Sequence, residues 1–276
     1  MKSTKIQTLD AVLAIPVLAI PVLAIPVLTL TDNDNPNDIR GSANDDQISG
    51  LGGSDDLRGR AGNDTILGGS GADTIRGELG DDSLLGQDGN DLIRGDTNLG
   101  IGGVGGHDFV DGGAGRDKLY GDQGNDTVRG GDDNDTVKGG TGDDVVSGDN
   151  GNDRVNGDAG NDLVLGGAGT DDLHGGLGND TIDGGTGSDI YHGDAGADTF
   201  VFSADGANDK IDDFQDGIDH IDLTAYGLAD FAAVLAVATQ TVDANGPHVL
   251  LTLGAGDIIN ISGLALAQLT ADDFFL

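Results

Sequence analysis

Seventeen aspartates are the residues of this chain whose type and spacing are best suited to chemistry. Each is the sixth residue of the pattern Gly-x-x-Gly-x-Asp-x-apolar-x, which runs through residues 41–201 with one interruption. A regular column of carboxylates is suited to binding cations, because an ion that lies between two of them reverses their mutual repulsion. The candidate metal ligands are Asp46, Asp55, Asp64, Asp73, Asp82, Asp91, Asp108, Asp117, Asp126, Asp135, Asp144, Asp153, Asp162, Asp171, Asp180, Asp189 and Asp198.

The donor atoms of this pattern favour calcium. The chain contains no cysteine, and its repeats offer aspartate carboxylates and the carbonyl groups of glycine-rich turns. Flexible sites made of oxygen ligands select calcium, whereas zinc prefers cysteine or histidine. Glycine at positions one and four of the repeat would permit positive φ angles that turn carbonyl groups inward. The sequence therefore predicts several bound Ca²⁺ ions.

The eighth position of the repeat predicts the elements that hold these aspartates. It is apolar or aromatic in all 17 repeats, which indicates one very short strand per repeat, burying one side chain. Two repeats would make one turn of a roll, so that strands of the same face are two repeats apart in the sequence and about 4.8 Å apart in space. Pairing each aspartate with the one two repeats further on predicts four pairs before the interruption and nine after it.

The same pattern predicts that calcium is part of the fold. One buried side chain per repeat is a thin core compared with the entropy cost of ordering a glycine-rich backbone. Carboxylates stacked about 5 Å apart also repel each other. Metal binding and folding are therefore expected to be one event.

The composition excludes several classes of protein. A net charge of −36 argues against a nucleic-acid partner, since phosphates require lysine and arginine. The absence of cysteine excludes a disulfide framework. An acidic chain with few aromatic residues is typical of disorder, but the strict repeat argues against that interpretation.

These repeats resemble the RTX (repeats-in-toxin) family of proteins that Gram-negative bacteria secrete, and the motif is a known calcium-binding repeat. Residues 68–76 (GGSGADTIR) and 175–183 (GGLGNDTID) fit it fully. The resemblance implies an all-β fold, a right-handed parallel β-roll with calcium in its turns. It also implies extracellular localisation and export by a type I (ABC-transporter) secretion apparatus.

Three regions follow from the pattern. Residues 1–31 form an apolar, proline-containing N-terminal segment, residues 32–201 form the β-roll, and residues 202–276 form a C-terminal cap with a secretion signal. Within the roll, residues 32–40 are expected to be a metal-poor capping turn, because Asn37 stands where Asp belongs. Residues 95–102 are one residue short of a full repeat, which indicates an irregular half-turn or a division into two rolls, with one continuous, kinked roll favoured.

The C-terminal region is expected to be a small mixed α/β module that covers the open end of the roll. An alanine-rich stretch at 228–239 predicts a helix, and residues 248–253 and 257–261 predict a hairpin around 254–256. Residues 270–276 (TADDFFL) resemble an uncleaved type I secretion signal. An ordinary last strand is the alternative, and the two are compatible.

The N-terminal segment has three open interpretations. Residues 11–30 carry no charge and repeat Ala-Ile-Pro-Val-Leu three times. Prolines at this regular, close spacing oppose a regular helix, which favours an extended segment that packs or binds a partner. A membrane-inserting segment and a cleaved signal peptide are the alternatives.

The remaining chemistry is sparse. The sequence contains no His-Glu-x-x-His and no Gly-x-Ser-x-Gly, and only the short stretch 1–40 precedes the repeats, so no enzyme is expected. His174 and His192, one turn apart, would suit a transition metal or would simply be exposed ninth positions. The sequence therefore predicts a secreted, non-enzymatic RTX protein that folds on binding extracellular calcium. A membrane-active protein that uses the N-terminal segment and a cell-surface adhesion protein are the alternatives.

Overall fold

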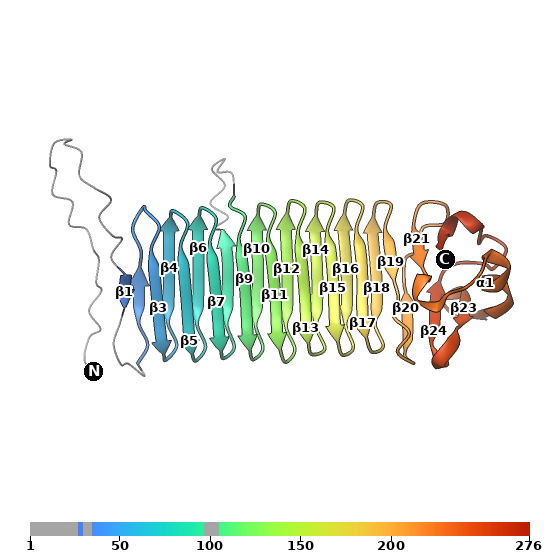
Figure 1. Ribbon diagram of the computed structural model, residues 1–276, viewed down its shortest axis with the longest axis horizontal. Helices are drawn as coiled ribbons and strands as arrows, with labels where there is room; N and C mark the ends of the chain where they lie inside the picture. The colour runs from blue at the N-terminus through green and yellow to red at the C-terminus, as the bar shows by residue number, and fades with distance from the viewer. Residues whose placement is uncertain (1–26, 30–34, 97–104) are drawn as a thin grey trace.

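The computed structural model describes residues 27–29, 35–96 and 105–276. Within these residues the chain forms a long roll of two facing parallel sheets with a small cap at its C-terminal end (Figure 1). Successive strands alternate between the sheets, so each strand pairs with the strands two before and two after it. The expected parallel β-roll with a mixed cap is confirmed.

The odd-numbered strands form one sheet of 12 described strands. In sheet order they are β1 (Val27–Thr29), β3 (Gln47–Gly52), β5 (Thr65–Ser70), β7 (Ser83–Asp88), β9 (Phe109–Ala114), β11 (Thr127–Asp132), β13 (Val145–Asn150), β15 (Leu163–Ala168), β17 (Thr181–Thr186), β19 (Thr199–Val201), β21 (His220–Asp222) and β25 (Phe274–Phe275).

The even-numbered strands and one hairpin form the other sheet, of 13 described strands. In sheet order they are β2 (Asp38–Arg40), β4 (Asp56–Ala61), β6 (Thr74–Leu79), β8 (Leu92–Asp96), β10 (Lys118–Gln123), β12 (Thr136–Thr141), β14 (Arg154–Ala159), β16 (Asp172–Leu177), β18 (Ile190–Ala195), β20 (Asn208–Ile211), β24 (Ile258–Ser262), β23 (Gly246–Thr252) and β22 (Ala238–Asp243).

The strands of the roll are longer than the sequence predicted. A typical strand such as β15 has six residues, which are positions seven to nine of one repeat and one to three of the next. The chain turns at positions four to six, so the sixth-position aspartate stands at the end of the turn. In β15 the inward residues are Val164 and Gly166, both buried. The glycine lengthens the strand although it adds no side chain to the core.

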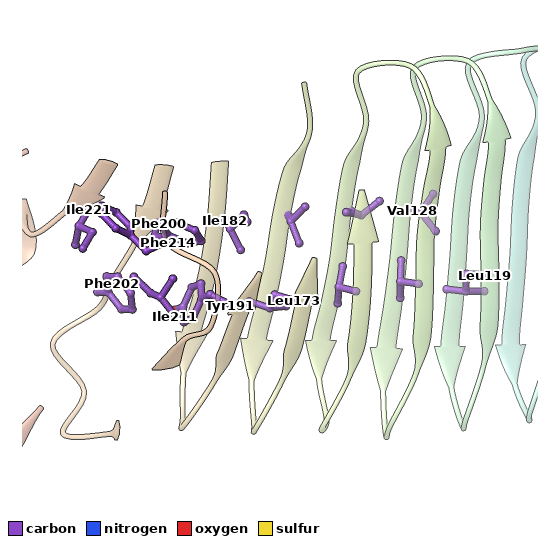
Figure 2. Close-up of a cluster of buried hydrophobic side chains, with 14 of the residues drawn as sticks. Leu119, Val128, Leu173, Ile182, Tyr191, Phe200, Phe202, Ile211, Phe214 and Ile221 are labelled. Atoms are coloured by element: carbon purple, nitrogen blue, oxygen red, sulfur yellow. The ribbon is translucent and has the colours of Figure 1, made fainter. Parts of the chain in front are cut away.

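The core is two rows of eighth-position side chains that meet between the sheets (Figure 2). All 17 of these side chains are buried, with at most 2% of their surface exposed. Parallel pairing between strands one turn apart places each eighth-position side chain next to the eighth-position side chain of the following turn, as Val146 lies next to Val164. Towards the C-terminus the aliphatic rows give way to Tyr191, Phe200 and Phe202.

The interruption does not divide the roll, and it is not a half-turn. Across it, β7 pairs with β9 and β8 pairs with β10, and Leu84 lies opposite Val110. A half-turn would have moved β9 into the other sheet. The additional residues are therefore an insertion within one repeat.

The cap closes the C-terminal end of the even sheet. After β20 this sheet continues with β24, then turns antiparallel through β23 and β22. The helix α1 (Phe231–Val237) is shorter than expected, and Asp230 caps it by accepting a hydrogen bond from the amide of Ala233 at 3.0 Å. Short 3₁₀ turns lie at η1 (Thr224–Tyr226), η2 (Gly254–Gly256) and η3 (Ala271–Asp273). The hairpin around η2 is confirmed.

The two chain ends continue the odd sheet. The last strand, β25, pairs with β21, and Phe274 is buried. At the other end β1 pairs with β3, whereas the rest of the apolar N-terminal segment lies outside the described residues. No helix in the described part of the chain is long and apolar enough to cross a membrane.

Candidate metal centres

All 17 sixth-position aspartates lie in one of two columns, one along each edge of the roll where the chain turns. In each column the main-chain amide of one aspartate donates a hydrogen bond to Oδ1 of the aspartate one turn further on. The amide of Asp126, for example, donates to Oδ1 of Asp144 at 2.8 Å, and the amide of Asp144 donates to Oδ1 of Asp162 at 2.8 Å. These bonds fix the orientation of each carboxylate and aim its other oxygen into the turn.

The second oxygen, Oδ2, is buried and lacks a protein partner in 15 of the 17 aspartates. The two exceptions are Asp189 and Asp46. Oδ2 of Asp46 accepts a hydrogen bond from the hydroxyl of Ser42 at 2.9 Å. Burying an unpaired carboxylate oxygen is costly. A repeated arrangement of this kind requires a compensating positive charge or proton.

Each orphaned oxygen faces a crowded spot beside the glycine at position one. A Cβ added to Gly157 would lie 2.4 Å from Oδ2 of Asp162 and 2.6 Å from the carbonyl oxygen of Gly175, one turn further on. The same pair of oxygens surrounds Gly139, where the distances are 2.4 Å to Oδ2 of Asp144 and 2.7 Å to the carbonyl of Gly157. A carboxylate oxygen and a carbonyl oxygen therefore converge from successive turns.

This crowding corrects the expected role of the first glycine. Position four has positive φ, as predicted, with φ of 150° at Gly160. The other positive φ lies at position two, for example 122° at Gly140 and 68° at Asp149. Position one is not in that region, so glycine is required there because a side chain would collide with the converging oxygens.

Burial raises the pKa of most of these carboxylates. It raises the pKa of Asp144 to about 7 and that of Asp108 to about 8. The hydrogen bond from the preceding aspartate's amide lowers each pKa, and neighbouring aspartates raise it further. Without a cation, the folded roll therefore favours protonated carboxylates.

The column extends beyond the predicted repeats. Asp189 donates its amide hydrogen to Oδ1 of Asp209 at 3.0 Å, and Asp198 donates to Oδ1 of Asp219 at 3.1 Å. Both acceptors are buried. Neither was predicted as a ligand, although each precedes a buried isoleucine by two residues, as a sixth position precedes an eighth. At the other end of the roll, Asn37 takes the place of the aspartate, and its main-chain amide donates a hydrogen bond to Oδ1 of Asp55 at 2.7 Å.

The columns also cross the insertion, which changes the predicted number of pairs. The amides of Asp82 and Asp91 donate to Oδ1 of Asp108 and Asp117, at 2.8 and 2.6 Å. Two pairs therefore join the four and nine that the regular spacing predicted. One further buried carboxylate, Asp96, lies beside the insertion and was not predicted from the repeat; burial raises its pKa to about 6.

The donor set fits a hard divalent cation. At 14 of the 17 first-position glycines, an unpartnered buried carboxylate oxygen and a main-chain carbonyl oxygen face the same spot, which we call the cradle. Both are ligands that calcium prefers. The outward arginines are occupied elsewhere, since Arg58 and Arg76 both form ion pairs with Asp56, at 2.8 and 3.0 Å. Neither arginine therefore neutralises the aspartate columns.

Comparisons with known proteins agree with this geometry. The family model described as the RTX calcium-binding nonapeptide repeat (4 copies) matches residues 32–66, 67–98, 102–137, 129–164 and 165–200. No curated protein is significantly similar to the chain.

Two solved structures are among those similar to the chain. One is the extracellular lipase LipA of Serratia marcescens, at 24% identity over 79% of this chain and 40% of the lipase, with a TM-score of 0.32. The other is a subunit of the mannuronan C5-epimerase of Azotobacter vinelandii, at 28% identity over 52% of this chain and 78% of the subunit, also with a TM-score of 0.32. The chain thus spans less than half of the lipase.

Proposed function

Because the chain belongs to the family of RTX calcium-binding nonapeptide repeat proteins, we propose that it is a secreted protein whose roll folds when its aspartate columns bind extracellular calcium. The observation that carries this proposal is the pair of oxygens repeated beside most first-position glycines, where the carboxylate oxygen has no hydrogen-bond partner. The ligands are the 17 sixth-position aspartates, joined by Asp209 and Asp219, together with the glycine carbonyls.

Calcium would decide between the folded and unfolded chain. In the absence of cations, either the buried carboxylates take up protons or the roll unfolds. The reason is that burial raises the pKa of carboxylates such as Asp135 and Asp153 to neutrality or above. Extracellular modules bind calcium with dissociation constants of about 10⁻⁴–10⁻³ M. A chain with this requirement stays open where calcium is scarce and folds where calcium is plentiful.

The C-terminal region supports export. Residues 270–276 resemble a type I secretion signal, and Phe274 and Phe275 also form the last strand of the odd sheet. We infer that this segment is read by the exporter while the chain is unfolded and closes the roll afterwards. Co-expression with a type I exporter tests this, because a chain lacking residues 270–276 should stay in the cells.

A binding role fits the site better than a catalytic one. Catalytic pairs need neighbouring groups whose pKa values are shifted apart. Here burial shifts the pKa of successive carboxylates such as Asp144 and Asp162 in the same direction. The arrangement repeats one cation-binding unit and does not assemble an acid and a base.

The deciding experiment is far-UV circular dichroism of the full chain, with calcium and with a chelator at pH 7.5. We expect strand signal only with calcium, together with a calorimetric stoichiometry of many ions per chain. Equal strand content in both conditions would refute calcium-coupled folding.

A further inference from the structure

A second kind of metal-binding geometry lies on the outer face of the even sheet, away from the aspartate columns. Asp172 and His174 on β16 and His192 on the neighbouring β18 each place a ligand atom within 4.8 Å of the other two. His174 and His192 are register partners, and their rings stack with centroids 4.3 Å apart and planes 4° apart. Nε2 of each ring faces Asp172.

The nitrogens of the two rings converge on one carboxylate oxygen. Nε2 of His174 lies 3.3 Å from Oδ1 of Asp172, and Nε2 of His192 lies 3.7 Å from the same oxygen. Ligands of a tetrahedral zinc ion, at bond lengths of about 2.0–2.1 Å, lie about 3.3–3.4 Å apart. The two nitrogen–oxygen separations are close to two edges of such a tetrahedron. Because the lone pair of an imidazole lies in the ring plane, one of the stacked rings must tilt for both to bind the same ion.

Two carboxylates flank His174 and favour a positive charge there. Its Nδ1 lies 3.2 Å from Oδ2 of Asp194, while its Nε2 faces Asp172. A neutral imidazole has one N–H and one lone pair. In either tautomer, therefore, a neutral His174 donates to one carboxylate and presents a lone pair to the other. Either a second ring proton or a metal ion at Nε2 removes this repulsion. With a metal ion bound, Asp194 accepts the Nδ1 hydrogen, an arrangement typical of metal-bound histidine.

We propose that Asp172, His174 and His192 form a site for Zn²⁺ or a similar divalent transition-metal ion, with Asp194 as the residue that orients His174. Two imidazoles and one carboxylate suit such ions, whereas calcium selects oxygen ligands. The three ligand side chains are partly exposed, at 19% for His174, 24% for His192 and 41% for Asp172. An ion therefore has access, and the strongly negative chain attracts it.

The site exists only in the folded roll. His174 and His192 are two repeats apart in the sequence and become neighbours because β16 pairs with β18. The site is thus chemically distinct from the calcium columns but depends on the same strand pairing. Bound zinc would fasten two adjacent turns at the C-terminal end of the roll.

The test is calorimetric titration of the calcium-saturated full chain with Zn²⁺, so that the carboxylate columns are already occupied. We expect one zinc ion per chain, no saturable binding in His192→Asn, and affinity weakened by about 10–100-fold in Asp194→Asn. Bound Co²⁺ should show the intense visible absorption of tetrahedral nitrogen and oxygen ligation.

The matched control is His248→Asn. His248 also lies beside a carboxylate, with Nε2 3.0 Å from Oδ1 of Asp243, but among the described residues it belongs to no group of three possible metal ligands. This variant should bind zinc like the parent chain. Circular dichroism in calcium shows whether each variant keeps its roll. The proposal is overturned if the parent chain does not bind zinc, or if His192→Asn keeps its roll and binds zinc as tightly as the parent.

Discussion

Replacing Asp144 with asparagine should have opposite effects on the metal-free and the calcium-bound chain. Asp144 is buried, its Oδ1 accepts a hydrogen bond from the amide of Asp126 at 2.8 Å, and its Oδ2 has no partner. Asparagine keeps the shape and the Oδ1 acceptor. Its amide group replaces Oδ2 next to the carbonyl of Gly157, where it can donate a hydrogen bond.

The magnitude follows from the pKa. Burial raises the pKa of Asp144 from 3.8 to about 7. Since one pKa unit corresponds to about 1.4 kcal/mol, ionising this group in the metal-free roll costs on the order of 4 kcal/mol. Asp144→Asn removes that cost. With calcium present at about 100 times its dissociation constant, each bound ion contributes about 2.7 kcal/mol. Asp144 is paired with both Asp126 and Asp162, so the same change removes two ions worth about 5.4 kcal/mol together, which exceeds the gain.

The adjacent residue provides a matched control. Asp143 is exposed, and its Oδ1 accepts a hydrogen bond from the amide of Asn161 at 2.8 Å. Asp143→Asn makes the identical chemical change and keeps this acceptor. We expect an effect of no more than about 0.5 kcal/mol.

The assay is a calcium titration followed by circular dichroism, combined with calorimetric ion counting. Asp144→Asn should bind fewer ions and need more calcium to fold, while its strand signal in calcium-free buffer at pH 7.5 should equal or exceed that of the parent chain. Equal shifts in Asp143→Asn and Asp144→Asn, or destabilisation of both states by Asp144→Asn, would refute the reasoning.

Four further predictions follow. Burial raises the folded pKa to about 6 at Asp162 and about 8 at Asp108, above the unfolded value of about 3.9. The metal-free roll should therefore gain strand signal on acidification from pH 8 to 5 and lose it as the pH rises again. Gly157→Ala places a methyl group 2.4 Å from Oδ2 of Asp162 and should cost about 1–3 kcal/mol, seen as a higher calcium midpoint; an unchanged midpoint would argue against the cradle. Leu173→Ala at a fully buried position should cost about 2–5 kcal/mol in chemical denaturation, whereas Leu177→Ala, at a side chain that is 64% exposed, should cost no more than about 0.5 kcal/mol. Deletion of residues 97–104 restores the regular two-repeat spacing across the interruption. Circular dichroism should show that the shortened chain still folds on adding calcium, and a chain that fails to fold would contradict this prediction.

The regular part of the fold could be predicted because each column of the repeat has one physical demand. The eighth position must be apolar, as at Val164, because it alone fills the space between the sheets. The role of the glycines was harder to predict, because glycine is required both where φ is positive and where a side chain would collide, and the residue type does not distinguish the two reasons. Gly160 is needed for its φ of 150°, whereas Gly157 is needed because two oxygens approach it.

The additional members of the columns were missed because their spacing changes while their local pattern does not. Asp209 and Asp219 follow their predecessors at longer intervals than the repeat dictates, so a search at a fixed period stops before them. The buried Ile211 and Ile221 keep the sixth-to-eighth relation and were the available signal. The histidine pair was visible as a spacing, but its carboxylate partners depended on the cross-strand geometry of β16 and β18.

The insertion shows what the functional unit of this roll is. Gly103 has the spacing of a first-position glycine relative to Asp108, but the residue whose Cβ would meet Oδ2 of Asp108, at 2.0 Å, is Gly95. Asp96 and Gly105 therefore occupy positions two and three of the same repeat, with residues 97–104 between them. The bond from Asp82 to Asp108 is nonetheless 2.8 Å long, as elsewhere in the columns. The cation-binding unit thus consists of three parts that meet in space: a first-position glycine, its sixth-position aspartate and the glycine carbonyl of the next turn. An uninterrupted nonapeptide is only the shortest sequence that brings them together.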